Sequence, residues 1–262
     1  MAKRPDGSIV IVNEADIGKK HVESRQAPIE PDLLYPLLRG QDVQRWCVEP
    51  SLQIILAQNP EIRVGWDENW MKETLPKTYA YFKRFEEQLR QRSGYKKYFN
   101  PDTAPFYSMY NVGLYTMSAH KVVWREVSTD LRAGVVTVEA ASKPIIPDHT
   151  LIAISTDEAE EAHYICALLN SSPSNFIVQG YVAMHPSPHV LKSISIPKFD
   201  PSDRTHQELA SLSRKAHEAK AVGGLSRLEK IEKSIDEVAA TIWGLTPEEL
   251  KDIQNSLKDL GE

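Results

Sequence analysis

Six positively charged side chains lie close together in the middle of the sequence, with only two carboxylates among them. Clustered Lys and Arg side chains are what a protein needs to bind the phosphates of a nucleic acid. Such a run is also typical of a helix whose charged face is simply solvated, and this alternative stays open. The candidate phosphate-binding residues are Lys83, Arg84, Arg90, Arg92, Lys96 and Lys97, with Arg125 as a further candidate on a predicted strand.

The charge of the whole chain is distributed unevenly. Its 31 Lys and Arg residues and 36 Asp and Glu residues leave a formal net charge of −5, which argues against a protein that coats nucleic acid. The carboxylates gather elsewhere, at 157–161 and at 248–262. An acidic protein with a basic middle can still present one positive face to DNA.

Sequence motifs of the common enzymes are missing. The chain has no glycine-rich dinucleotide loop, no P-loop, no nucleophile elbow and no HExxH zinc motif. Asn100-Pro101-Asp102 lacks the aromatic fourth residue of the Asn-Pro-Pro-Tyr loop that amino-methyltransferases use, and Glu139 and Lys143 do not have the spacing of common restriction nucleases. We therefore expect no catalytic residue and no bound cofactor on this chain.

Metal and thiol chemistry also lack a supporting pattern. Prolines beside His185 and His189 prevent a helix from placing both imidazoles on one face, so we interpret these histidines as part of a surface loop. Cys47 and Cys166 lie far apart in the sequence. We expect two free thiols and no metal site.

The elements that must position the basic residues follow from hydrophobic periodicity. Short β-branched runs predict strands, and apolar residues at three- and four-residue spacing predict helices. We expect strands at 8–12, 52–57, 121–127, 134–139, 150–155, 176–182 and 190–196. We expect helices at 31–35, 76–94, 158–170, 205–221 and 226–243, a further helix from 247, and an irregular aromatic loop at 95–118.

Three signals mark the ends of these helices. Gly94 suits a left-handed cap at the end of the 76–94 helix. Ser155 and Glu158 have the spacing of a capping box at the start of the next helix, and Thr246 and Glu249 have the same spacing before the last one.

These elements fall into two regions. Strands and helices alternate up to about residue 200, whereas 203–262 contains no strand-like run. The expected fold is α+β (mixed α/β), with a body at 1–200 on a largely antiparallel or mixed sheet and a helical appendage at 201–262. A hydrophobic content of 41% excludes a disordered chain, and no apolar run is long enough to span a membrane, so we expect the protein in the cytoplasm without a membrane partner.

Several separated segments resemble one family. Residues 36–46 read PLLRGQDVQRW, which is similar to the "PLL(R/K)G-x-D-(I/V)-x-R-aromatic" segment of TaqI-like and fused adenine-N6 DNA methyltransferases. No single match is specific, and the combination gains its weight from order and spacing across 29–253. The later matches are the tyrosine-rich Pro76–Arg92 segment, Lys121–Val123, ALLNS at 167–171, Ile194–Pro197, and 235–249, which ends in WGLTPEE where the family usually has Tyr for Trp243.

The resemblance implies the C-terminal target-recognition (specificity) domain of such an enzyme, in a type II restriction-modification or phage-defence system. The implied partners are double-stranded DNA and an adenine-N6 methyltransferase catalytic domain or subunit. The family's catalytic half, which would hold S-adenosylmethionine, is absent from the sequence, and the resemblance begins part-way into the recognition region. The chain alone is therefore expected to transfer no methyl group.

Two other functions stay open. The chain could be a self-contained DNA-modifying or DNA-cleaving enzyme with degenerate motifs, or a specificity subunit that binds a protein partner through its helical tail. Arg39 and Arg45 have two interpretations as well, because each could meet a phosphate or hold an internal contact, such as a turn closed by an Arg39–Asp42 ion pair.

Overall fold

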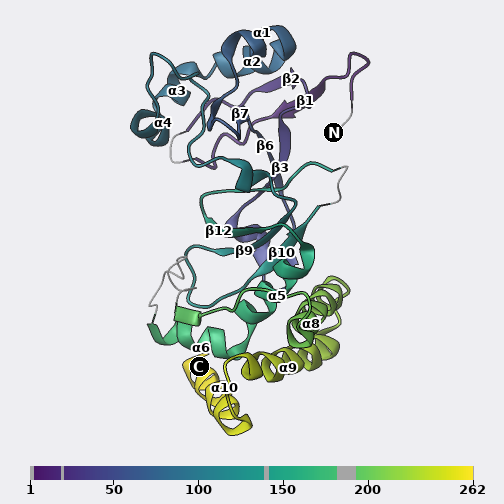
Figure 1. Cartoon of the computed structure of the whole chain (residues 1–262). Helices are drawn as coiled ribbons and strands as arrows, with labels where there is room; N and C mark the ends of the chain where they lie inside the picture. Colours follow the sequence, from purple (N-terminus) through teal and green to yellow (C-terminus); the bar gives the residue numbers. More distant parts are fainter. Residues whose placement is uncertain (1–2, 19–20, 139–141, 182–192, 262) are drawn as a thin grey trace. The chain divides into compact units, whose positions relative to one another are not determined.

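The computed structural model describes residues 3–18, 21–138, 142–181 and 193–261. Figure 1 shows the helices and strands of the chain. The chain divides into two compact units, each with its own hydrophobic clusters. Unit 1 comprises Met1–Tyr35 and Gln53–Met117, and unit 2 comprises Pro36–Leu52 and Ser118–Glu262. The predicted boundary at residue 200 falls inside unit 2, and the separation of a body from an appendage stays a prediction.

The fold is α+β, as the sequence predicts, because small antiparallel and mixed sheets are accompanied by many helices. No helix of the described ranges is long and apolar enough to cross a membrane. The strands are β1 (Ile9–Val12), β2 (Gln26–Ile29), β3 (Leu34–Leu38), β4 (Val43–Gln44), β5 (Cys47–Val48), β6 (Leu52–Ile55), β7 (Gln58–Asn59), β8 (Val64–Gly65), β9 (His120–Arg125), β10 (Gly134–Thr137), β11 (Ile146–Pro147) and β12 (Leu151–Thr156). The helices are α1 (Glu68–Thr74), α2 (Pro76–Lys83), α3 (Glu86–Arg90), α4 (Ser93–Tyr98), α5 (Ala159–Asn170), α6 (Ser172–Tyr181), α8 (Arg204–Ala221), α9 (Leu225–Ile242) and α10 (Pro247–Gly261), with short 3-10 helices η1 (Gly40–Asp42) and η2 (Leu114–Met117).

Unit 1 is built around an antiparallel strand pair and the helices that follow it. Ile9 of β1 pairs with Ile29 of β2, and both side chains are buried against Tyr81 of α2. A second cluster joins the α1–α2 region to the long loop after α4, through Met71 and Phe106 among others. Both clusters pack against the basic segment 83–97, the first through Phe85 and the second through Leu89.

The single helix predicted at 76–94 is wrong, because the segment forms three short helices. Helix α2 ends where the N–H of Arg84 donates to the carbonyl of Tyr81 and the N–H of Phe85 donates to the carbonyl of Phe82. The break lets Phe85 pack into the cluster around Ile9, whereas Leu89 packs into the cluster around Met71. Gly94, predicted to cap the helix end, is instead inside α4, which also makes the predicted loop at 95–118 partly helical.

The short helix predicted between Pro31 and Pro36 is also wrong, because residues 31–33 form a turn and strand β3 begins at Leu34. Leu37 and Leu38 pair in parallel with Ile146 and Pro147 of β11. That partner is far away in the sequence, so no local pattern reveals it.

Unit 2 has a three-stranded antiparallel sheet in the order β10-β9-β12. The side chains of β9 alternate between two hydrophobic clusters. Val122 and Trp124 pack with α5, α8 and α9, and Val123 packs on the other side with Leu38 and Val43. The sheet is therefore buried on both faces at its central strand.

Further corrections concern the chain on either side of α5. The predicted strand at 176–182 is helix α6 over its described part, and of the predicted strand at 190–196 the described residues Ser193 and Ile194 are helical. Ser155 pairs within β12 and does not cap α5, which begins after Glu158 without a side-chain cap.

The helices of the tail are confirmed. The side chains of Leu228, Ile231 and Ile235 on α9 join the same cluster as α5 and α8. The capping box before α10 is present, because the N–H of Thr246 donates to Glu249 Oε2 at 2.8 Å and the N–H of Glu249 donates to Thr246 Oγ1 at 3.2 Å.

Candidate nucleic-acid interface

Two of the predicted phosphate-binding residues share one carboxylate in unit 1. Lys83 Nζ lies 2.5 Å from Glu86 Oε2, and Arg90 Nη2 lies 2.9 Å from Glu86 Oε1. Hydrogen bonds from these two cations keep the pKa of Glu86 below its usual value, so the carboxylate is charged at neutral pH. Both cations also lie near the ring of Phe106, at 5.4 Å and 5.6 Å from its centroid. Glu86 therefore offsets one of their two positive charges, and both side chains are already engaged within the protein.

Arg92 is occupied by the backbone. Its Nη2 donates to the carbonyl oxygens of Phe106 at 3.1 Å and Ser108 at 2.9 Å, and its Nε donates to the carbonyl of Leu89 at 2.9 Å. Burial lowers the pKa of Arg92, although a guanidinium stays protonated at neutral pH. In this position Arg92 holds the 105–108 loop against α3.

The remaining cations of the basic segment are more available. Arg84, Lys96 and Lys97 are exposed. Within the described ranges none of the three forms an ion pair with a carboxylate, although Lys96 Nζ donates to Gln91 Oε1. These three side chains can meet an external phosphate without losing an internal salt bridge.

Four further side chains beside Lys97 escaped the sequence analysis. Tyr98 and Tyr110 stack at a centroid distance of 3.6 Å and an interplanar angle of 9°, and both are about half exposed. The guanidinium of Arg63 lies 5.8 Å from the ring centroid of Tyr115. The richness of segment 95–118 in tyrosine was the available signal, but nothing in the sequence placed Arg63 next to it.

The last predicted site residue, Arg125, lies at the end of β9 in unit 2. Its Nε donates to the carbonyl oxygen of Gly40 at 2.7 Å, and the N–H of Gly40 donates to Thr150 Oγ1 at 2.8 Å. A surface cavity of about 330 Å³ opens here, lined also by Glu126 and His149. Arg125 thus anchors the 3-10 turn and contributes one cationic group to a small open cavity.

The turn at Arg39 is present, but the suggested Arg39–Asp42 ion pair is not its closure. Asp42 Oδ2 accepts a hydrogen bond from the backbone N–H of Arg39 at 2.8 Å. A side-chain-to-backbone bond of this kind is a common way to close a tight turn.

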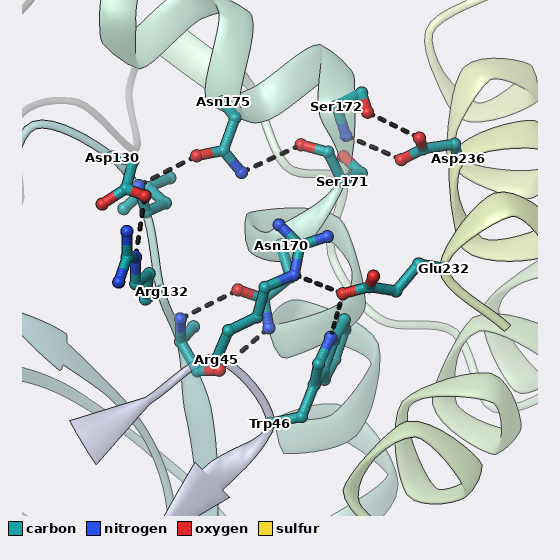
Figure 2. Close-up of polar contacts among 12 residues, drawn as sticks. Arg45, Trp46, Asp130, Arg132, Asn170, Ser171, Ser172, Asn175, Glu232 and Asp236 are labelled. Atoms are coloured by element: carbon teal, nitrogen blue, oxygen red, sulfur yellow. Dashed lines mark hydrogen bonds and ion pairs between the residues drawn. The ribbon is translucent and has the colours of Figure 1, made fainter. Parts of the chain in front are cut away.

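Arg45 makes an internal ion pair in unit 2, so its structural interpretation is the one observed. Arg45 Nε and Trp46 Nε1 both donate to Glu232 Oε1 of α9, at 2.5 Å and 2.7 Å (Figure 2). The Trp46 ring is almost completely buried. This carboxylate therefore ties the β4–β5 hairpin to α9.

Two buried asparagines hold the loop that leads into β10. Asn170 Oδ1 accepts from the N–H of Ala133 and its Nδ2 donates to the carbonyl of the same residue, both at 2.9 Å (Figure 2). Asn175 Oδ1 accepts from the N–H of Leu131 at 2.9 Å. The α5–α6 junction thereby satisfies backbone groups that burial removes from water.

A third contact joins α6 to α9 and α10. Asp236 accepts from the backbone N–H and the hydroxyl of Ser172, the first residue of α6, and Gln254 Nε2 donates to Asp236 Oδ2 at 2.9 Å. Figure 2 shows Asp236 reaching Ser172 from a separate helix. We call the contacts of Arg45, Trp46, Asn170, Ser172, Glu232 and Asp236 the motif network, because the segments that resemble the methyltransferases supply all but Ser172 and Glu232.

The predictions about histidines, metal binding and thiols have different outcomes. His185, His189 and the loop around them lie outside the described residues. Within the described ranges, no three His, Cys, Asp or Glu side chains are arranged to hold a metal ion. Cys47 and Cys166 are free thiols, as predicted.

Comparisons with known proteins place these features in context. No family model matches the sequence. The chain is 30% identical over 144 residues to the Type II methyltransferase M.NspV of Nostoc sp., a match that covers 55% of this chain and 28% of that protein. Its fold is similar to part of the type IIL restriction-modification enzyme MmeI, solved in complex with DNA, with a TM-score of 0.56 and 12% identity over 85% of this chain and 31% of that one.

The chain thus spans less than a third of the length of either protein. At 12% identity the likeness to MmeI concerns the fold alone. This chain is a partial relative of a restriction-modification methyltransferase and has a fold found within a restriction-modification enzyme.

Proposed function

We propose that this chain is the DNA target-recognition part of an adenine-N6 methyltransferase from a restriction-modification system. The observation that carries the proposal is the similarity to a type II methyltransferase of which the chain spans only 28%. A methyltransferase must rotate its target base out of the duplex, so the reading of the flanking sequence falls to a separate part of the enzyme. The sequence of this chain has none of the catalytic motifs, which is consistent with that separate part.

The fold likeness supports the same proposal. The similar portion of MmeI is 31% of an enzyme that was solved with DNA bound, and it accounts for 85% of this chain. This chain is similar to a part of each of two restriction-modification proteins, so that part would perform a step that both proteins need. Binding duplex DNA and recognising its sequence is such a step.

The charges of unit 1 suggest where phosphates bind. Lys83 and Arg90 would reach a phosphate only by giving up bonds to Glu86, and Arg92 only by releasing backbone carbonyls. Arg84, Lys96 and Lys97 have no such competing carboxylate among the described residues. We therefore expect the exposed three to supply most of the phosphate contacts of the predicted set, with Arg125 as a contact of unit 2.

Fluorescence anisotropy with a labelled duplex over a salt series tests the proposal. The affinity should fall as salt rises, because phosphate binding releases counterions, with a slope of about 0.9 for each phosphate contact. Selection from a pool of randomised duplexes should enrich one sequence motif. A flat, salt-independent absence of binding would refute DNA recognition, and binding without any enrichment would refute sequence reading.

We further propose that S-adenosylmethionine binding and methyl transfer reside in a separate catalytic domain or subunit. Titration calorimetry of this chain with S-adenosylmethionine should give no saturable heat. A saturable heat would favour the alternative of a self-contained enzyme with degenerate motifs.

A further inference from the structure

Five residues of unit 1, which we call the tyrosine patch, combine exposed rings with cations. They are Arg63, Lys97, Tyr98, Tyr110 and Tyr115. The residues Tyr98, Tyr110 and Tyr115 are 45%, 52% and 42% exposed, although aromatic side chains normally bury much of their area. The pKa of Tyr110 is raised, first by its hydrogen bond with Tyr98 and to a smaller degree by Tyr115, because the three phenols are neighbours.

Uncharged rings position the two cations of the patch. Lys97 Nζ lies 5.0 Å from the ring centroid of Tyr98, and the guanidinium carbon of Arg63 lies 5.8 Å from that of Tyr115. Neither cation forms an ion pair with any described residue, in contrast to Lys83 and Arg90, which share Glu86. A cation held over an aromatic face keeps its full charge for an external anion.

The backbone around the patch is built to hold it. Arg63 in the β7–β8 turn has a φ of 56°, and Asn111 beside Tyr110 has a φ of 61°. A Cβ atom at Gly113 would lie 2.8 Å from Tyr115 Cε1 and 3.2 Å from Arg63 Nε, so any other residue there would force the ring or the guanidinium to shift. A left-handed conformation at a residue such as Arg is uncommon and is often associated with a functional site.

We propose that the tyrosine patch binds the sugar–phosphate backbone of duplex DNA. Arg63 and Lys97 contact phosphate oxygens, and the hydroxyl of Tyr98, which accepts a hydrogen bond from Tyr110 within the patch, donates a further hydrogen bond to the backbone. Charge complementarity selects the partner, because the patch carries two unneutralised positive charges and no paired carboxylate among the described residues. The inference rests on the proposed function and adds Arg63, which lies outside the predicted basic segment.

A pair of double variants with equal loss of charge tests the patch. Arg63→Asn with Lys97→Gln removes both cations, and asparagine tolerates the left-handed backbone at position 63. The matched control is Lys72→Gln with Lys77→Gln, since these lysines are paired with Glu68 at 3.0 Å and Asp6 at 2.5 Å in the same unit. Equal urea midpoints for wild type and both variants establish that each chain is folded.

Anisotropy over a salt series then gives the decisive measurement. The Arg63/Lys97 variant should lower the slope of log affinity against log salt by about two, equally for duplexes of different sequence, whereas the control leaves it unchanged. The charge-neutral change Tyr115→Leu should weaken binding by about two- to fivefold, the value of a lost cation–π contact.

The outcomes separate this inference from the proposed function. If wild type binds DNA and both double variants change the slope equally, the patch is not a phosphate site and the proposed function stands. If wild type binds no duplex at any salt concentration, both are refuted. Should the Arg63/Lys97 variant fail to fold, Tyr115→Leu and Lys97→Gln alone must still weaken binding, and full affinity in both would overturn the inference.

Discussion

Replacing Asn170 with alanine should lower the free energy of unfolding of unit 2 by about 2–4 kcal/mol. The side chain is fully buried, and so is Ala133, whose N–H and carbonyl it binds at 2.9 Å each. Without Asn170, the N–H of Ala133 keeps no acceptor and no water, which costs about 1–3 kcal/mol. The Ala133 carbonyl retains the N–H of Trp46 at 3.1 Å, so its loss is one ordinary bond, about 0.5–1.5 kcal/mol.

Urea unfolding followed by tryptophan fluorescence measures this effect, since Trp46 and Trp124 are buried in unit 2. With a slope of about 2 kcal/mol per molar urea, the midpoint should fall by roughly 1–2 M. Asn13→Ala is the matched control. Asn13 makes the same pair of backbone bonds, to the N–H of Arg25 at 2.6 Å and the carbonyl of Glu23 at 3.0 Å, but in an exposed position where water replaces them.

The same variant separates structural from DNA-contacting roles in the motif network. Asn170→Ala should keep the wild-type salt slope of DNA binding under conditions where it is folded, because its side chain has no route to a phosphate. Equal midpoint shifts for Asn170→Ala and Asn13→Ala would refute the burial argument. A changed salt slope with an unchanged midpoint would refute the structural role altogether.

Three further outcomes follow from buried or capping groups. Burial lowers the pKa of His163 to about 3 and also lowers that of His217, whereas both titrate near 6.5 when unfolded, so stability is complete above pH 6.5 and falls as the pH drops from 6.5 toward 3. The urea midpoint of the wild type should therefore be lower at pH 5 than at pH 7.5, and His163→Gln should make this difference smaller. The same difference in the wild type and the variant would contradict the prediction. Burial raises the pKa of both thiols, but Cys47 is partly exposed and Cys166 is fully buried, so a thiol reagent at neutral pH should label Cys47 first and Cys166 only after unfolding. Thr246→Ala removes the cap of α10 and should cost about 1 kcal/mol in thermal unfolding, with no loss expected for Thr246→Ser.

Local patterns predicted the parts of the fold whose contacts are themselves local or periodic. Leu228, Ile231 and Ile235 repeat with the helical period and are all buried on one side of α9. The capping box before α10 was predictable for the same reason, because its two partners are three residues apart. Strand β9 was predictable from its β-branched run.

Elements fixed by distant partners could not be predicted. Helix α6 contains the β-branched, aromatic run that indicated a strand, yet it is helical, and Asp236 caps its first backbone N–H from 64 positions away in sequence. Strand β3 likewise depends on β11, and Pro36 within it suggested a helix boundary instead. In both places the tertiary partner overrides the local preference.

The candidate site divides in the same way. Residue type and clustering indicated the cations, but the sequence could not say which of them are already bonded. Glu86 lies between Lys83 and Arg90 in sequence and bonds to both. Two of the three carbonyls that occupy Arg92 belong to Phe106 and Ser108, more than ten residues later. Arg63 reaches Tyr115 only through the fold.

The motif network changes what the family resemblance means. Arg45, Trp46, Asn170 and Asp236 come from three separated segments that resemble the methyltransferases, and in unit 2 each of them bonds to another part of the protein. Side chains already engaged in internal bonds cannot also read base edges without breaking them. Resemblance at these positions is therefore evidence for a common fold, and the DNA sequence that a relative recognises does not transfer with it. Under the proposed function, sequence reading would then depend on residues outside the motif network.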